Sequence, residues 1–112
     1  MANEKILCAA IWYKELPLIK DFEHNFRPVN CDRGIVFCGH RHPHCLYSMC
    51  AMTGKRSVTF AEDGVGEHIQ GFLTSKNRFV DREEALVIAL AENQVIDLDN
   101  IRNNELHSED LY

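Results

Sequence analysis

The sequence lacks the features that would direct it into a membrane or onto a nucleic-acid backbone. No apolar run approaches the ~20 residues that a membrane-spanning helix needs, and the first residues carry no signal-peptide cleavage pattern. Lysine and arginine number 12 against 17 aspartates and glutamates, which gives a formal net charge of -5. Binding to bulk DNA or RNA requires a basic face, which this balance does not supply. We therefore expect a cytoplasmic protein with no membrane partner and no bulk nucleic-acid partner.

The sequence also lacks any CxxC pair, and its five cysteines are an odd number. A disulfide framework is typical of exported proteins with an even number of cysteines. Reduced thiols are therefore expected. Free cysteine usually behaves as a small apolar residue, so Cys8 and Cys50 are predicted to lie in the core.

The length of 112 residues predicts a single domain that spans residues 1–112. A domain of this size has a modest hydrophobic core, and association with a second copy would bury more apolar surface. A homo-oligomer, a dimer or larger, is therefore expected.

Apolar runs and turn residues predict the order of the elements. Strands are expected at 5–13, 34–39, 55–61 and 67–74, with a hairpin turn at 62–66 and a short extended segment at 78–80. Irregular structure is expected at 14–33. The pattern predicts an α+β fold with an antiparallel or mixed sheet of about four strands and two buried helices. The acidic segment 97–112 is expected to dock on this domain through its apolar residues.

Both helices carry boundary signals. Pro43 suits a first helical turn, and Gly54 suits the end of the same helix. Asp81 followed three residues later by Glu84 is typical of a capping box, which begins the second helix. Residues 85–91 of that helix are apolar on every side, a pattern that predicts burial under the sheet or against a partner chain.

Three histidines lie within five residues, between a predicted strand and a predicted helix: His40, His42 and His44. With the neighbouring cysteines they could bind zinc, but their spacing matches no usual zinc motif, so no metal and no cofactor are assigned. A histidine could also act as an acid or base near pH 7. Arg41 and the histidines could instead recognise a phosphate at the helix start, or the residues could form a plain polar loop.

A second group of polar residues stands at the other junction between a strand and a helix. Asn77, Arg78 and Arg82 gather near the expected N-terminus of the second helix, where free N–H groups favour anions. The alternative is that both arginines pair with neighbouring acidic residues on a solvated surface. We expect the two arginine-bearing junctions to converge on a pocket for a small anion.

Three motifs resemble a known family: residues 39–45 (GHRHPHC), 70–85 (QGFLTSKNRFVDREEA) and 108–112 (SEDLY). They are similar to the Thoeris anti-defence sponge proteins of phages and prophages. The resemblance implies an oligomer of α+β protomers in the bacterial host cell. Such a protein captures a cyclic ADP-ribose isomer without cleaving it, so that the host's immune effector is not triggered.

Nine residues are candidates to bind a ligand of this class. Arginines suit its phosphates, polar side chains its hydroxyl groups, and aromatic rings its base. The candidates are Arg41, His42, Gln70, Phe72, Thr74, Asn77, Arg78, Phe79 and Arg82. Two other functions stay open: a small histidine- or metal-dependent phosphodiesterase that acts on a similar nucleotide, and an inhibitor that binds a host protein through its acidic tail.

Overall fold

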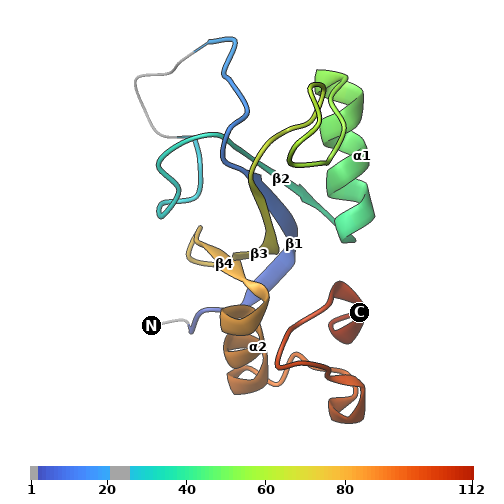
Figure 1. Ribbon diagram of the computed structural model, residues 1–112. Helices are drawn as coiled ribbons and strands as arrows, with labels where there is room; N and C mark the ends of the chain where they lie inside the picture. Colours follow the sequence, from blue (N-terminus) through green and yellow to red (C-terminus); the bar gives the residue numbers. More distant parts are fainter. Residues whose placement is uncertain (1–2, 21–25) are drawn as a thin grey trace.

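The chain forms one four-stranded sheet with two α-helices, seen in a computed structural model that describes residues 3–20 and 26–112 (Figure 1). The strand order is β2-β1-β3-β4, and every neighbouring pair is antiparallel. The predicted α+β class is therefore confirmed, with the antiparallel form of the sheet. The elements are β1 (Ile6–Tyr13), β2 (Ile35–Gly39), α1 (His42–Thr53), β3 (His68–Thr74), β4 (Phe79–Asp81) and α2 (Arg82–Ala91), followed by the 3-10 turns η1 (Leu98–Asn100) and η2 (Ser108–Asp110).

The central pair of strands decides which side chains face the helices. Ala9 of β1 pairs with Phe72 of β3, and Ala10 pairs with Gly71. Because neighbouring residues of a strand point to opposite faces, Ala9 and Phe72 share one face with Gln70. Ala10 and Gly71 lie on the other. The pocket described below is built on the first of these faces.

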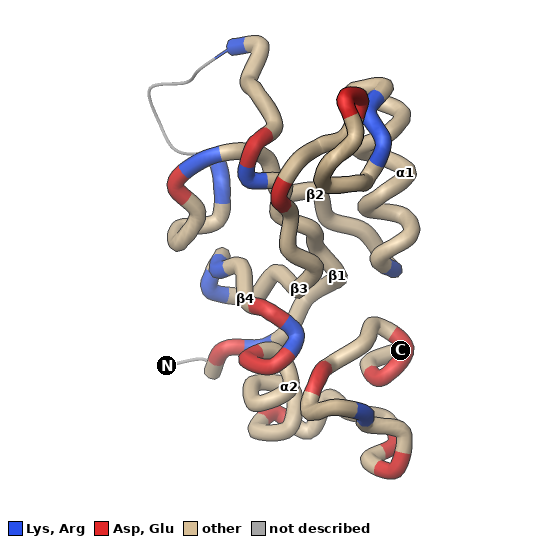
Figure 2. The backbone as a smooth tube through the Cα atoms, viewed as in Figure 1, with Lys and Arg blue, Asp and Glu red and all other residues tan. Residues whose placement is uncertain are grey.

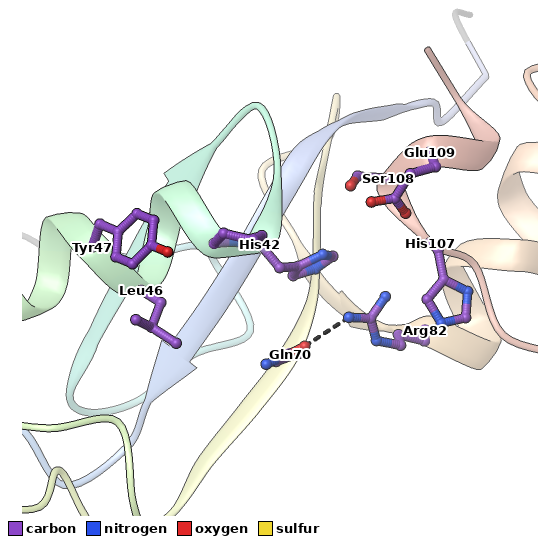
Figure 3. A pocket seen from close by; sticks show the side chains of 9 residues that line it. His42, Leu46, Tyr47, Gln70, Arg82, His107, Ser108 and Glu109 are labelled. Carbon is purple, nitrogen blue, oxygen red and sulfur yellow. Dashed lines mark hydrogen bonds between the residues drawn. The ribbon is translucent and has the colours of Figure 1, made fainter.

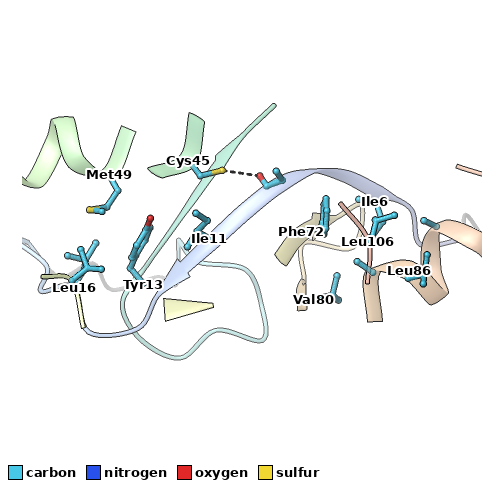
Figure 4. Close-up of a cluster of buried hydrophobic side chains, with 14 residues drawn as sticks. Ile6, Ile11, Tyr13, Leu16, Cys45, Met49, Phe72, Val80, Leu86 and Leu106 are labelled. Carbon is cyan, nitrogen blue, oxygen red and sulfur yellow. Dashed lines mark hydrogen bonds between the residues drawn. The ribbon is translucent and has the colours of Figure 1, made fainter. Parts of the chain in front are cut away.

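The main core covers that face and joins both helices to the C-terminal segment (Figure 4). Helix α1 contributes Cys45 and Met49, and α2 contributes Ala85, Leu86 and Ala89, all of them buried. Figure 1 shows α1 and α2 toward opposite ends of the sheet, with the C-terminal segment beside α2. The sheet therefore holds the starts of both helices and this last segment on one side.

The boundary signals of both helices operate as the sequence indicates. Gly54 ends α1 in the left-handed region at φ 71°, and its N–H bonds to the carbonyl of Cys50. Asp81 begins α2 by accepting a hydrogen bond from the backbone N–H of Glu84 at 2.8 Å. The second half of the expected capping box is replaced, because the Glu84 carboxylate pairs with Arg78 instead.

Within the single chain, α2 is buried on one side only, against the sheet. Burial of its other side against a partner chain stays a prediction. Val87 is 68% exposed and Leu90 is 44% exposed in the single chain. Apolar composition alone identified the helix but did not show which side faces the sheet.

The strand expected at 55–61 and the hairpin turn at 62–66 are wrong. Residue Arg56 forms only an isolated bridge with Gly64, and the segment closes on itself through an ion pair between Arg56 and Asp63. Phe60 is 98% exposed, so its apolar side chain has no sheet to face. The fourth strand is instead β4, in the short segment that the sequence marks as extended.

Candidate functional site

A hollow of about 390 Å³ lies where α1, β3, the start of α2 and the C-terminal segment meet (Figure 3). Its volume falls at the small end of the range for small-molecule sites, roughly 300–1,000 Å³. One wall is apolar and the opposite wall is polar or charged. The lining residues are His42, Pro43, Leu46, Tyr47, Gln70, Arg82, His107, Ser108 and Glu109.

His42 is the first residue of α1, and its ring is turned inward toward the sheet. Its Nε2 lies 2.8 Å from the carbonyl oxygen of Gly71, and the rings of His42 and Phe72 form a T-shaped pair at 5.1 Å between centroids. Burial lowers the pKa of His42 to about 4, although the bond to Gly71 opposes this shift. The imidazole is therefore neutral at pH 7.

Arg82 is the first residue of α2 and joins three segments of the chain. Its Nη1 donates to the carbonyl of Leu106 at 2.9 Å, and its Nη2 donates to Gln70 Oε1 at 2.6 Å. Burial lowers the pKa of Arg82, while Glu105, Glu109 and Asp110 oppose this shift. A guanidinium carries five N–H donors, so donors remain for a ligand.

The charge of Arg82 is compensated only at a distance. Figure 2 shows acidic residues along α2 and the C-terminal segment, yet among the described residues none forms an ion pair with Arg82. The pocket therefore contains a partly desolvated cation, and the Glu109 carboxylate lines the same pocket without pairing with it. This pair suits a ligand that carries both an anionic group and hydroxyl donors.

Opposite these charges, α1 supplies an apolar wall from Pro43, Leu46 and Tyr47. The Tyr47 side chain is 66% exposed, so its ring is accessible to a bound molecule. An exposed aromatic ring gives a flat ligand a surface on which to stack.

The last wall comes from the C-terminal segment, which internal hydrogen bonds hold in place. Leu106 donates its backbone N–H to the carbonyl of Arg82 at 2.9 Å. His107 donates its backbone N–H to Asp110 Oδ2 at 2.9 Å and starts the turn that presents Ser108 and Glu109. Most of the polar wall therefore depends on residues that follow α2 by more than ten positions.

Three of the nine candidate residues line this pocket together: His42, Gln70 and Arg82. Both junctions between a strand and a helix thus contribute to the pocket through the first residue of the helix, His42 in α1 and Arg82 in α2. Arg41 lies outside the hollow, with its guanidinium 5.1 Å from the centre of the Tyr112 ring. Arg78 also lies outside, where Glu4 holds it at 2.8 and 2.9 Å and Glu84 at 2.9 Å. Arg78 therefore forms ion pairs with acidic residues, which is the alternative that the sequence left open for it.

The other four candidates also lie outside the pocket. Phe72 is fully buried, and Phe79 is 5% exposed and forms a T-shaped pair with the ring of Trp12. The hydroxyl of Thr74 donates to Glu4 Oε2 at 2.6 Å. Asn77 occupies a turn at φ 57°. The two phenylalanines therefore offer no ring face to a base in this structure.

Near the start of α1, the rings of His40 and His44 stack on each other at 6.2 Å between centroids, whereas His42 turns toward the sheet. His40 stacks on Tyr112 at 4.4 Å between centroids, His42 faces the sheet, and His44 Nδ1 accepts a hydrogen bond from the Arg41 backbone N–H. Among the described residues, no three histidine, cysteine or acidic side chains are grouped as metal ligands.

Six lining residues were not among the sequence-based candidates: Pro43, Leu46, Tyr47, His107, Ser108 and Glu109. The ring of Tyr47 is of the kind that stacks on a base, and residues 108–112 form one of the three motifs that carry the family resemblance. Neither signal shows that α1 and the C-terminal segment face each other, because that contact is formed only in the folded chain.

Comparison with known proteins identifies a family. The family model described as phage T4 y16D protein matches residues 5–112, which include every residue of the pocket. No curated protein and no solved structure matches the chain. Among the described helices, none is long and apolar enough to cross a membrane. The family match gives no link to Thoeris sponge proteins, and it shows that the chain belongs to the phage T4 y16D protein family.

Proposed function

We propose that this phage-family protein binds a nucleotide of the cyclic ADP-ribose class and holds it intact, as a counter-defence protein in the host cytoplasm. The observation that carries the proposal is Arg82. It is a partly buried cation with unused donors, and it lies in a small pocket opposite an aromatic ring. A nucleotide offers both an anionic group and a flat base.

Each part of such a ligand has a counterpart in the pocket. Arg82 suits a phosphate because charge-assisted hydrogen bonds are about twice as strong as neutral ones. The Glu109 carboxylate can accept hydrogen bonds from ribose hydroxyls, as acidic residues do in dinucleotide sites. Tyr47 and Leu46 supply the surface for the base. The acidic neighbours of Arg82 disfavour a highly charged ligand, so this one cation matches a nucleotide with few phosphates.

Capture without cleavage is favoured by the state of His42. A general base works best when its pKa is near the working pH, whereas that of His42 is about 4. A second candidate function is a histidine-dependent phosphodiesterase, because His107 Nδ1 lies 3.8 Å from Asp110 Oδ2, a carboxylate that could orient the ring. The two functions differ in whether the ligand is returned unchanged.

The proposal includes a homo-oligomer. The apolar wall is open to solvent at Tyr47, and α2 exposes Val87 and Leu90. A second copy could cover apolar surface that one chain leaves exposed. Light scattering coupled to size-exclusion chromatography would give the number of chains, and a monomer at all concentrations would contradict this part of the proposal.

The central experiment measures both capture and fate of the ligand. Purified protein is mixed with cyclic ADP-ribose isomers, freed of unbound ligand and heated, and the released nucleotide is identified by mass spectrometry. Intact ligand in stoichiometric amount is expected. Released product would support the phosphodiesterase, and absence of binding to every isomer would refute the proposal and favour an inhibitor of a host protein.

A matched pair of arginines tests the site. Arg82→Gln should weaken binding by roughly tenfold or more, the loss expected for a charge-assisted hydrogen bond. Arg78→Gln should leave binding within about twofold, because Arg78 pairs with Glu4 and Glu84 outside the pocket. Tyr47→Ala gives a second test at an exposed position, where the fold does not depend on the ring. Equal effects of the two arginine changes would contradict the assignment.

A further inference from the structure

Two pocket side chains have a hydrogen-bonding polarity that their partners fix. An amide or an imidazole can ordinarily present either a donor or an acceptor, and its orientation is often ambiguous. Gln70 and His42 are exceptions, because one is held by a donor-only group and the other by an acceptor-only group.

For Gln70, the fixing group is Arg82. A guanidinium only donates, so the Gln70 atom 2.6 Å from Arg82 Nη2 must be the carbonyl oxygen. The amide nitrogen then points away from Arg82 (Figure 3). It has no hydrogen-bond acceptor among the described residues, and it presents two N–H donors at the pocket wall.

For His42, the fixing group is the carbonyl of Gly71. A carbonyl only accepts, so Nε2 carries the proton and Nδ1 carries a free lone pair. Among the described residues, Arg41 Nη1 is the one side-chain polar atom that is both buried and without a hydrogen-bond partner. Nδ1 of His42 also has no partner among these residues but is not such a buried atom, so it keeps some exposure. The ring lies beside Gln70, since it bonds to the carbonyl of the next residue along β3 (Figure 3). His42 and Gln70 both line the pocket, so its wall contains an acceptor from α1 and a donor from β3.

We propose that this pair reads the amino edge of an adenine, with the 6-amino group donating to His42 Nδ1 and ring nitrogen N1 accepting from Gln70 Nε2. The inference rests on the proposed function, whose ligand class already contains adenine, and adds the edge by which the pocket recognises this base. It requires an isomer in which adenine N1 is free and not part of the ring closure. Hypoxanthine carries its acceptor and donor in the reverse order along this edge. It would have to turn over to bind, which would move its ribose away from Glu109. An adenine with both positions blocked has no donor for His42.

The test compares ADP-ribose with its 1,N6-etheno derivative, in which both edge positions are blocked. The etheno compound should bind the wild-type protein at least about tenfold more weakly, because it would cover His42 Nδ1 and Gln70 Nε2 without forming a hydrogen bond to either. Calorimetry on the full chain measures both affinities. Equal affinities would overturn the inference, as would failure to bind ADP-ribose while a cyclic isomer is captured. If no cyclic isomer is captured either, the proposed function fails as well.

Gln70→Glu separates recognition of the edge from the added bulk of the etheno ring. The carboxylate can still accept from Arg82, while its second oxygen replaces the amide donor with an acceptor. The preference for ADP-ribose over the etheno compound should therefore fall to about twofold or less. Ribose 5-phosphate, which has no base, measures the effect of the added charge alone. If the preference is unchanged in this variant, steric exclusion explains it and the inference is wrong.

Discussion

At the scale of single residues, two groups of opposite character stand beside each other in the pocket. His42 is neutral because burial disfavours its charged form, and Arg82 stays charged although it is partly buried. Neither state is a property of the residue type alone. The Gly71 carbonyl holds His42 at Nε2, while the Gln70 amide and the Leu106 carbonyl hold Arg82. Nδ1 of His42 and the remaining N–H groups of Arg82 are therefore available to a ligand.

The low pKa of His42 predicts a loss of stability in mild acid. Its folded-state pKa of about 4 lies below the ordinary value of 6.5. Between these two pH values the unfolded chain therefore binds a proton at His42 and the folded chain does not. This contribution to stability is complete above pH 6.5 and is lost as the pH falls toward 4, by up to about 3 kcal/mol. Urea unfolding of the wild type and of His42→Gln between pH 7 and pH 4 measures it.

His42→Gln should lose less stability than the wild type between pH 7 and pH 4. His44→Gln, at an exposed position of the same helix, should lose as much as the wild type. An NMR titration of the His42 ring provides a direct check. A pKa near 6.5 would contradict the buried, neutral ring.

Arg78 and Glu4 are predicted to contribute to stability and not to ligand binding. Hydrogen bonding to Arg78, with a smaller contribution from Thr74, lowers the pKa of Glu4 to about 2 from 4.5. The stabilisation is thus present above pH 4.5 and lost as the pH falls toward 2. Glu4→Gln should lower the free energy of unfolding at pH 7 by about 1–2 kcal/mol. The Arg56–Asp63 pair is exposed to solvent, so Asp63→Asn should have no measurable effect on the free energy of unfolding.

At the scale of the element, α2 is defined by its first residues more than by its apolar run. Asp81 caps the helix, and Arg82, the next residue, reaches the pocket. The cap therefore fixes where the helix starts and also the position from which the guanidinium extends. The exposed side of the helix, with Val87 and Leu90, takes no part in the pocket.

Removing the cap should cost stability without removing the pocket. Asp81→Ala is expected to lower the free energy of unfolding by about 1 kcal/mol, because the Glu84 N–H loses its acceptor. Asp81→Asn keeps an acceptor oxygen and should cost much less. Thermal or urea unfolding of both variants checks this prediction. An equal loss for both would mean that the charge of Asp81, and not the cap, is what stabilises the helix.

At the scale of the whole molecule, the C-terminal segment completes the pocket that the sheet and the helices begin. Leu106 is fully buried in the main core, and its backbone bonds to Arg82 in both directions. His107, Ser108 and Glu109 follow directly and form the polar wall. Core packing and the binding site are therefore coupled through one residue.

Leu106→Ala should reduce both stability and ligand binding. A buried leucine replaced by alanine costs about 2–5 kcal/mol, and loosening this anchor would displace the Glu109 wall. Leu98→Ala, at a position 67% exposed in the same part of the chain, should change neither property by much. Urea unfolding and calorimetry on the two variants provide the comparison. Full affinity in a destabilised Leu106→Ala protein would show that the segment is not part of the site.

The sequence by itself determined the local structure of most of the chain. Pro43 and Gly54 bounded α1, Asp81 began α2, and apolar runs located β1, β2 and β3, because caps and strand patterns are properties of neighbouring residues. The sequence pattern predicted a strand at 55–61 that the structure does not contain, because no neighbouring strand pairs with this segment. Only the tertiary structure decided that Arg82 faces a pocket while Arg78 pairs with Glu4, 74 residues away. Which partner a charged side chain meets depends on how distant segments pack, and spacing along the chain does not determine this.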